Sequence, residues 1–213
     1  MQVALKDLEL RGAGNLLGAE QAGHIAGVGF DLYLRMIGEA VATFRGDDVE
    51  GPTELRLELP VQARIPESYI DSERLRLEAY QKLSAAASVT AKDDAIDLVI
   101  DELTDRYGDL PPEVDGLLAV ARLRRRAARA GLADVVAIGP NLRIAPANLP
   151  DSMRVRLQRL HPKAKLVQSG EALVVPLPTA GGEAMTDAGL IAWVAQLIEQ
   201  LWPEKVAEPV GSV

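Results

Sequence analysis

The residues with the most specific chemical pattern lie in a glycine-rich stretch, residues 11–29. Gly12 and Gly14 begin a G-x-G-x-x-G spacing, which is typical of dinucleotide-binding turns, but Leu17 occupies the position of the third glycine. Neither a preceding strand nor the expected acidic residue downstream is clear. The glycines suit turns and close backbone approaches better than a regular helix or strand. We therefore expect no dinucleotide site in this stretch.

The rest of the sequence lacks the residues that several kinds of catalysis require. No G-x-x-x-x-G-K-[ST] segment occurs, so the sequence has no P-loop to hold a nucleoside triphosphate. The absence of cysteine excludes disulfides, thiol catalysis and cysteine-ligated metals. Two histidines, His24 and His161, are too few for a multi-histidine metal site. We expect no catalytic residue, no metal site and no cofactor in this chain.

A second group of candidate residues lies on a helix predicted over about residues 92–107. Its apolar positions fall on one side and its acidic positions on the other: Ile96, Val99, Ile100, Leu103 and Tyr107 against Asp94, Asp97, Asp101, Glu102 and Asp105. Glu102 and Asp105 are three residues apart, so their side chains are neighbours on the helix surface. A solvated acidic face is the simpler interpretation of this spacing, and a binding surface is the alternative.

The charge of the sequence is unevenly distributed. The formal net charge of −8 argues against a protein that coats nucleic acid without specificity. Residues 111–180 nevertheless hold eleven basic and five acidic residues, and Arg122, Arg124, Arg125, Arg126 and Arg129 follow one another on a predicted helix. No aromatic residue interleaves these arginines, so base stacking is not supported. A solvated helix face is the simpler interpretation, and a nucleic-acid patch is the alternative.

The elements that carry these residues are predicted from hydrophobic spacing and from turn residues. The expected helices cover about residues 30–46, 72–88, 92–107, 112–130, 151–161 and 186–202, and the expected strands cover 55–63, 133–139, 141–145, 165–168 and 171–176. Pro60 places the first strand at a sheet edge or near its own end. The two later pairs of strands are separated by short turns, which favours antiparallel hairpins.

Helices and antiparallel hairpins are segregated along the sequence, so we predict an α+β fold. It would comprise an N-terminal glycine-rich segment with a long helix, then a C-terminal domain of helices packed on antiparallel strands. The predicted boundaries are residues 1–46 for the first part, 47–54 for a linker, 55–203 for the domain and 204–213 for a disordered tail.

The sequence shows no run of about eighteen apolar residues, so no membrane-spanning helix is expected. No basic segment followed by an apolar one opens the chain, so no secretory signal is expected either. The first residues resemble the interior of a domain, so we expect the chain to be part of a longer protein. The absence of cysteine is compatible with a reducing cytosol, and a cytoplasmic location is expected.

Residues 7–41, DLELRGAGNLLGAEQAGHIAGVGFDLYLRMIGEAV, closely resemble the transcription-repair coupling factors, or Mfd proteins. The shared core is R-G-A-G-x-L-L-G-x-E-Q-x-G followed by G-F-x-L-Y, and a related R-G-x-G…Q-x-G segment occurs in RecG branch-migration helicases. The downstream segments ELRLELPVQARIPESYI, RLRLEAYQKL and IDELTDRYGDLPPEV resemble the C-terminal domain found only in Mfd. The sequence is therefore identified as a C-terminal piece of a member of this family.

The resemblance implies a parent that is a DNA translocase driven by ATP with Mg. Such a parent displaces stalled RNA polymerase from double-stranded DNA and recruits nucleotide excision repair through UvrA. Its translocation motif matches Arg11, Gly12, Gly14, Gly18 and Gln21, and the motif's arginine and glutamine help to couple ATP hydrolysis to movement. An arginine fork can bind phosphate or carboxylate, and a glutamine amide can change partners when a motor closes.

The resemblance also implies a regulatory role for the C-terminal domain. In the family this domain docks on an N-terminal module that resembles UvrB, which hides the surface for UvrA and restrains the motor. The outward acidic positions of the family's E-L-x-D-R-[FY]-G segment correspond to Glu102 and Asp105. These two residues, with the neighbouring Asp101, are the predicted docking residues. A free-standing acidic adaptor that binds another protein through its helices is the alternative function.

Overall fold

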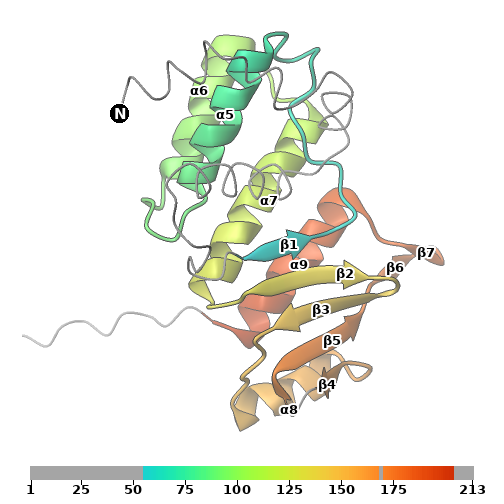
Figure 1. Ribbon diagram of the computed structural model, residues 1–213. Helices are drawn as coiled ribbons and strands as arrows, with labels where there is room; N and C mark the ends of the chain where they lie inside the picture. Colours follow the sequence, from blue (N-terminus) through green and yellow to red (C-terminus); the bar gives the residue numbers. More distant parts are fainter. Residues whose placement is uncertain (1–54, 168–169, 204–213) are drawn as a thin grey trace, which may run out of the picture.

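The structure is a computed structural model that describes residues 55–167 and 170–203 (Figure 1). The predicted coupling residues Arg11, Gly12, Gly14, Gly18 and Gln21 therefore lie outside the described residues. The same holds for the predicted long helix, the linker and the tail. None of the helices within 55–167 and 170–203 is long and apolar enough to cross a membrane.

The described part of the chain contains helices that lie on and beside one main sheet (Figure 1). The first strand and three helices come first in the chain: β1 (Arg56–Glu58), α5 (Glu73–Ala86), α6 (Ala95–Tyr107) and α7 (Pro112–Arg129). The remaining elements are β2 (Asp134–Ile138), β3 (Asn141–Ala145), α8 (Asp151–Leu160), β4 (Lys165–Val167), β5 (Ala172–Pro176), β6 (Thr179–Ala180), β7 (Glu183–Ala184) and α9 (Asp187–Leu201). The α+β prediction is confirmed.

The main sheet has five strands in the order β1-β2-β3-β5-β4. Its register aligns Leu57 with Val135, Val135 with Ile144, and Ile144 with Leu173, and all four side chains are buried. Because side chains alternate along a strand, this row belongs to the face that packs into the core. The opposite face carries polar groups, including Arg143, whose Nη1 lies 2.6 Å from Asp134 Oδ2.

One strand pair corrects the prediction of antiparallel strands. β1 pairs with β2 in parallel, whereas β2–β3, β3–β5 and β4–β5 are antiparallel. Parallel strands need a long crossover connection, and helices α5, α6 and α7 supply it between β1 and β2. The sheet is therefore mixed, with β1 at one edge as Pro60 predicted.

The segment after β1 leaves the sheet and crosses α7. The amide of Gln62 donates to Asp187 Oδ1 at 2.8 Å, and the amide of Arg64 donates to the carbonyl of Glu113 at 3.3 Å. A Cβ atom on Gly116 would lie 2.7 Å from the Gln62 carbonyl oxygen, so only glycine allows this close crossing. The predicted strand over 55–63 consequently ends at Glu58.

Helix α7 lies at the centre of the helical layer and packs against α9, α5 and α6. Its side chains Val114, Leu117 and Ala121 are fully buried. In Figure 1, α5 and α6 lie at one end of the molecule, and the sheet with α8 lies at the other. Helix α6 and strand β4 therefore lie at opposite ends of the molecule (Figure 1).

Candidate interaction surface on helix α6

Helix α6 is amphipathic, and its apolar side anchors it to the rest of the domain. Ile96, Val99 and Leu103 are buried against the core. Gly108 follows the helix with a φ of 84°, a left-handed conformation that suits glycine and ends the helix. The hydroxyl of Tyr69 lies 3.1 Å from the carbonyl oxygens of both Leu103 and Gly108, which fixes this end of the helix.

The opposite side of α6 presents carboxylates to solvent. Asp97, Asp101 and Asp105 are exposed, and Leu98, 59% exposed, lies among them. Asp101 and Asp105 have no hydrogen bond or ion pair with any residue that the structure describes. The structure therefore brings Asp101 and Asp105 to one exposed face, as their spacing predicted.

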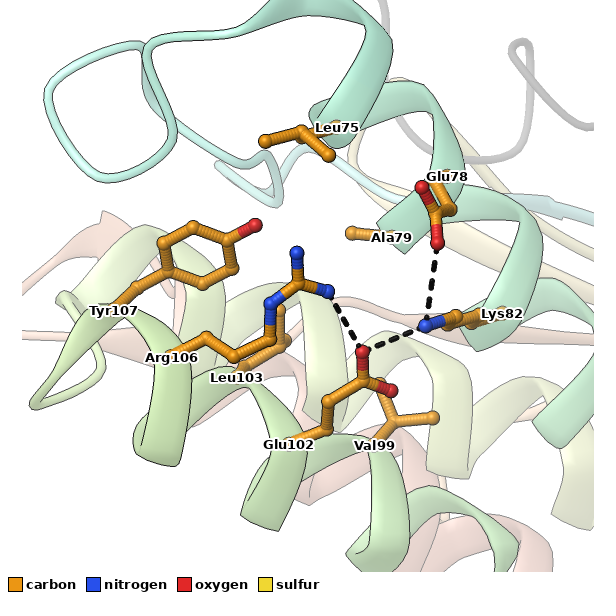
Figure 2. A pocket seen from close by; sticks show the side chains of 9 residues that line it. All are labelled: Leu75, Glu78, Ala79, Lys82, Val99, Glu102, Leu103, Arg106 and Tyr107. Carbon is orange, nitrogen blue, oxygen red and sulfur yellow. Dashed lines mark hydrogen bonds and ion pairs between the residues drawn. The ribbon is translucent and has the colours of Figure 1, made fainter.

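Glu102 is in a different situation from its neighbours. Its Oε1 accepts from Lys82 Nζ at 2.6 Å and from Arg106 Nη1 at 3.0 Å (Figure 2). Lys82 also lies 3.4 Å from Glu78, one turn away on α5. We call Lys82, Glu102 and Arg106 the charged triad. The triad links α5 to α6, so Glu102 has structural partners within the domain.

The charged triad shifts the proton affinity of its members. The hydrogen bond from Lys82, and then the one from Arg106, lowers the pKa of Glu102 below its ordinary value. The hydrogen bond to Glu102 raises the pKa of Lys82 and of Arg106 in the same way. Glu102 is therefore ionised at neutral pH, with its charge largely directed at two cations of its own domain.

The charged triad lies over a small groove between α5 and α6 (Figure 2). Apolar side chains line its wall: Leu75, Ala79, Val99, Leu103 and Tyr107. Its cavity volume is about 10 Å³, which is room for about one water molecule. No three histidine or carboxylate side chains within 55–167 and 170–203 gather to hold a metal.

The arginines of α7 are engaged inside the domain. Arg122 pairs with Asp97 at 2.7 Å, Arg126 with Glu199 at 2.7 Å, and Arg129 with Asp93 at 2.6 Å. Arg125 donates to the backbone carbonyls of Lys92 and Asp93, and Arg124 is only 9% exposed. This run therefore joins α7 to the start of α6 and to α9, which argues against the nucleic-acid patch considered from the sequence.

Comparison with known proteins identifies the family of this domain. The TRCF domain family model matches residues 59–156, which include α5, α6 and α7. The transcription-repair-coupling factor of Mycobacterium tuberculosis (strain CDC 1551 / Oshkosh) is 48% identical over 216 residues, which cover 94% of this chain. The chain belongs to the transcription-repair-coupling factor family. The resemblance carried by the sequence motifs is thereby confirmed.

Other transcription-repair-coupling factors match a shorter part of the chain. Those of Bacillus subtilis (strain 168) and Myxococcus xanthus are 38% and 43% identical, over 58% and 57% of this chain and 10% of their own lengths. The chain spans 17% of the length of the Mycobacterium tuberculosis relative. The crystal structure of a C-terminal domain of transcription-repair coupling factor has the same fold, with a TM-score of 0.58 and 18% identity, over 73% of this chain and 96% of that one.

Proposed function

We propose that this chain is the C-terminal regulatory and interaction module of an ATP-dependent DNA translocase that displaces stalled RNA polymerase and recruits nucleotide excision repair. Its membership of the transcription-repair-coupling factor family supports this role. The sequence has no P-loop, which agrees with a motor, using ATP with Mg, that lies in another part of the parent. UvrA, RNA polymerase and double-stranded DNA would be partners of that parent.

The exposed acidic face of α6 is the observation that carries the regulatory part of the proposal. Asp101 and Asp105 have no partner among the described residues, so their charges are available to cations of another surface. The proposed partner is the UvrB-like N-terminal module of the same protein. Exposed ion pairs contribute only ~0.2–1 kcal/mol each, so a contact built from several of them can form and be released.

Glu102 takes a second role in this proposal. Its carboxylate is held by Lys82 and Arg106, which reduces the negative charge that it presents outward. We therefore assign most of the attraction to Asp101 and Asp105, and we assign to Glu102 the task of holding α6 against α5. All three residues predicted from the sequence keep a part in the docking surface.

The test is the affinity of this chain for the separately produced N-terminal module. Asp101→Asn with Asp105→Asn is expected to weaken binding about tenfold at low salt, which corresponds to about 1.4 kcal/mol. The control, Glu67→Gln with Glu171→Gln, makes the same charge change at exposed side chains away from α6. It is expected to change the affinity less than about twofold.

Two results would overturn the proposal in different ways. Equal affinity for the α6 variant and the control, with both folded by circular dichroism, would place the docking surface elsewhere on the domain. Absence of any binding by the unmodified chain would favour the free-standing acidic adaptor. A weaker effect of the α6 variant at high salt is expected because screening already reduces the attraction.

A further inference from the structure

Four basic side chains on and just after α8 lie at the end of the molecule opposite α6 (Figure 1). Unlike the arginines of α7, they have no ion-pair partner among the described residues. Arg156 and Arg159 on α8, Lys163 in the turn that follows and Lys165 at the start of β4 are all exposed. None of the four has an ion pair or side-chain hydrogen bond with a residue of 55–167 or 170–203. We call Arg156, Arg159 and Lys163 the α8 patch, because Leu166 packs against the core that α8 and α9 share, and Lys165 beside it in β4 therefore points to the opposite face of the sheet.

The sequence around the α8 patch contains no compensating acid. Asp151 is the last acidic residue before it and Glu171 the next one after it. Asp151 lies 3.9 Å from Arg154, which is a different side chain. Residues 152–170 of the sequence therefore carry basic side chains and no acidic one, although the formal net charge of the whole chain is −8.

Helix α8 holds its cations on a fixed platform. Leu157 is fully buried, and Arg154 Nε donates to the carbonyl of Leu149 at 2.9 Å. The His161 ring at the end of the helix meets the Trp193 ring of α9 edge-on, with centroids 6.0 Å apart. Arg156 and Arg159 are three residues apart and so are neighbours on the outer surface. The helix backbone that carries the two arginines is already ordered, so binding an anion costs only the freedom of their side chains.

The chemistry of the α8 patch fits phosphate groups in a regular array. Arginine binds phosphate through two N–H groups at once, and lysine binds it as a point charge. The segment Arg154–Val167 has no Phe, Tyr or Trp, so it has no platform on which single-stranded bases could stack. Contacts made only to phosphates carry no sequence information.

We propose that the α8 patch binds the phosphate backbone of double-stranded DNA without sequence specificity. The site is separate from the acidic face of α6, because α6 and α8 lie at opposite ends of the molecule (Figure 1). The proposal therefore goes beyond the docking function and can fail or succeed independently of it. With about three phosphate contacts, the logarithm of the binding constant should fall with the logarithm of salt concentration with a slope of about −2.7.

The experiment measures binding of the full chain to a labelled mixed-sequence duplex of about 20 base pairs by fluorescence anisotropy, at about 50 mM salt and above. Arg156→Gln with Arg159→Gln is expected to weaken binding about tenfold or more, and to reduce the salt slope by about 2. The matched control is Arg122→Gln with Arg126→Gln, which removes the same charge from arginines that are paired within the domain. That control is expected to stay within about threefold of the unmodified chain.

Further arms separate the proposed ligand from its competitors. Val155 is 63% exposed beside the patch, and Val155→Ser should leave DNA binding unchanged, whereas an acidic protein partner would use this apolar side chain. A single strand of the same length should bind more weakly than the duplex, since stacking is missing. No binding at low salt, equal binding by the α8 and α7 variants, a preference for the single strand, or loss of binding in Val155→Ser would each overturn the proposal.

Discussion

Lys82 Nζ lies 2.6 Å from Glu102 Oε1. The two residues are 20 positions apart in the sequence, and their ion pair joins helix α5 to helix α6. Arg106 approaches the same oxygen from the next turn of α6. A carboxylate with two cationic partners keeps its charge more readily than a solvated one, so the pair responds to pH in a defined direction.

The first prediction concerns the proton affinity of Glu102. Because its pKa is lowered in the folded chain, its contribution to stability is present above the ordinary carboxyl pKa and is lost as pH falls through the folded value. Replacing Lys82 with Met should raise the Glu102 pKa back toward its ordinary value, because the largest cause of the lowering is removed. Titration of the Glu102 side chain by NMR would show the change.

Denaturant unfolding of the same two proteins provides the companion measurement. The stability advantage of the unmodified chain over Lys82→Met should be small at neutral pH, because the side chains of the triad are 37% to 42% exposed and water screens their attraction. It should shrink further below about pH 4. An advantage that grows on acidification would show that the Lys82–Glu102 pair is not its source.

The second prediction concerns the crossing of the segment after β1 over α7. Gly116→Ala would place a Cβ atom 2.7 Å from the Gln62 carbonyl oxygen, so the backbone must move. We expect a loss of about 1–3 kcal/mol in the free energy of unfolding, measured in urea. Gly189→Ala on α9 is the control, because its Cβ would meet only the flexible Met185 side chain at 3.2 Å. A larger loss in the control would contradict this explanation.

The third prediction concerns His161, whose Nε2 is buried without a hydrogen-bond partner among the described residues. An unsatisfied buried polar atom costs about 1–3 kcal/mol, and a phenyl ring of similar shape removes that cost. His161→Phe should therefore keep or raise the stability while it preserves the edge-on contact with Trp193. Urea unfolding followed by tryptophan fluorescence measures the free energy of unfolding, and the fluorescence of the folded protein reports on the surroundings of Trp193. A loss above about 1 kcal/mol would indicate that Nε2 has a partner after all.

The fourth prediction concerns Arg11 and Gln21, which lie outside the described residues. In the full-length protein, Arg11→Ala or Gln21→Ala should reduce displacement of RNA polymerase by more than it reduces ATP turnover, if the proposed function holds and these residues couple ATP hydrolysis to movement. Parallel assays of the two activities provide the measurement. Normal displacement by both variants would show that these roles do not carry over from the family.

Much of the fold could be predicted from residue spacing. The helices expected over 72–88, 92–107 and 112–130 appear as α5, α6 and α7 with ends shifted by at most a few residues, because apolar side chains recur with the helical period. The strand expected over 55–63 was too long. Its alternating apolar residues remain partly buried after Glu58, but they pack outside the sheet.

The features that were missed depend on contacts between distant residues. The parallel pairing of β1 with β2 requires three intervening helices to fold between them, which no local pattern reveals. The hairpin of β6 and β7 did have a local signal, the Gly181-Gly182 turn, that could have predicted it.

In the candidate site, too, local spacing predicted some features, whereas contacts between distant residues could not be predicted. Spacing alone predicted the exposed positions of Asp101 and Asp105 on one helix face. It could not predict that Lys82 would hold Glu102, nor that Asp93, Asp97 and Glu199 would neutralise the arginines of α7. A charge run therefore says little about binding until the partners of its side chains are known, and here Arg156 and Arg159 of α8, outside that run, have no partner among the described residues.

The parallel pairing of β1 with β2 also has a consequence for the order in which the domain assembles. Hairpins such as β2–β3 join neighbours in the chain, so they close small loops and can form early. β1 can add to the sheet edge only after the long segment through α7 has closed, which is a high-contact-order event. We expect β1 to be the last strand to gain protection from hydrogen exchange during refolding. β1, which follows residues 1–54 in the chain, would then be the last strand to join the sheet and the one that leaves it most readily.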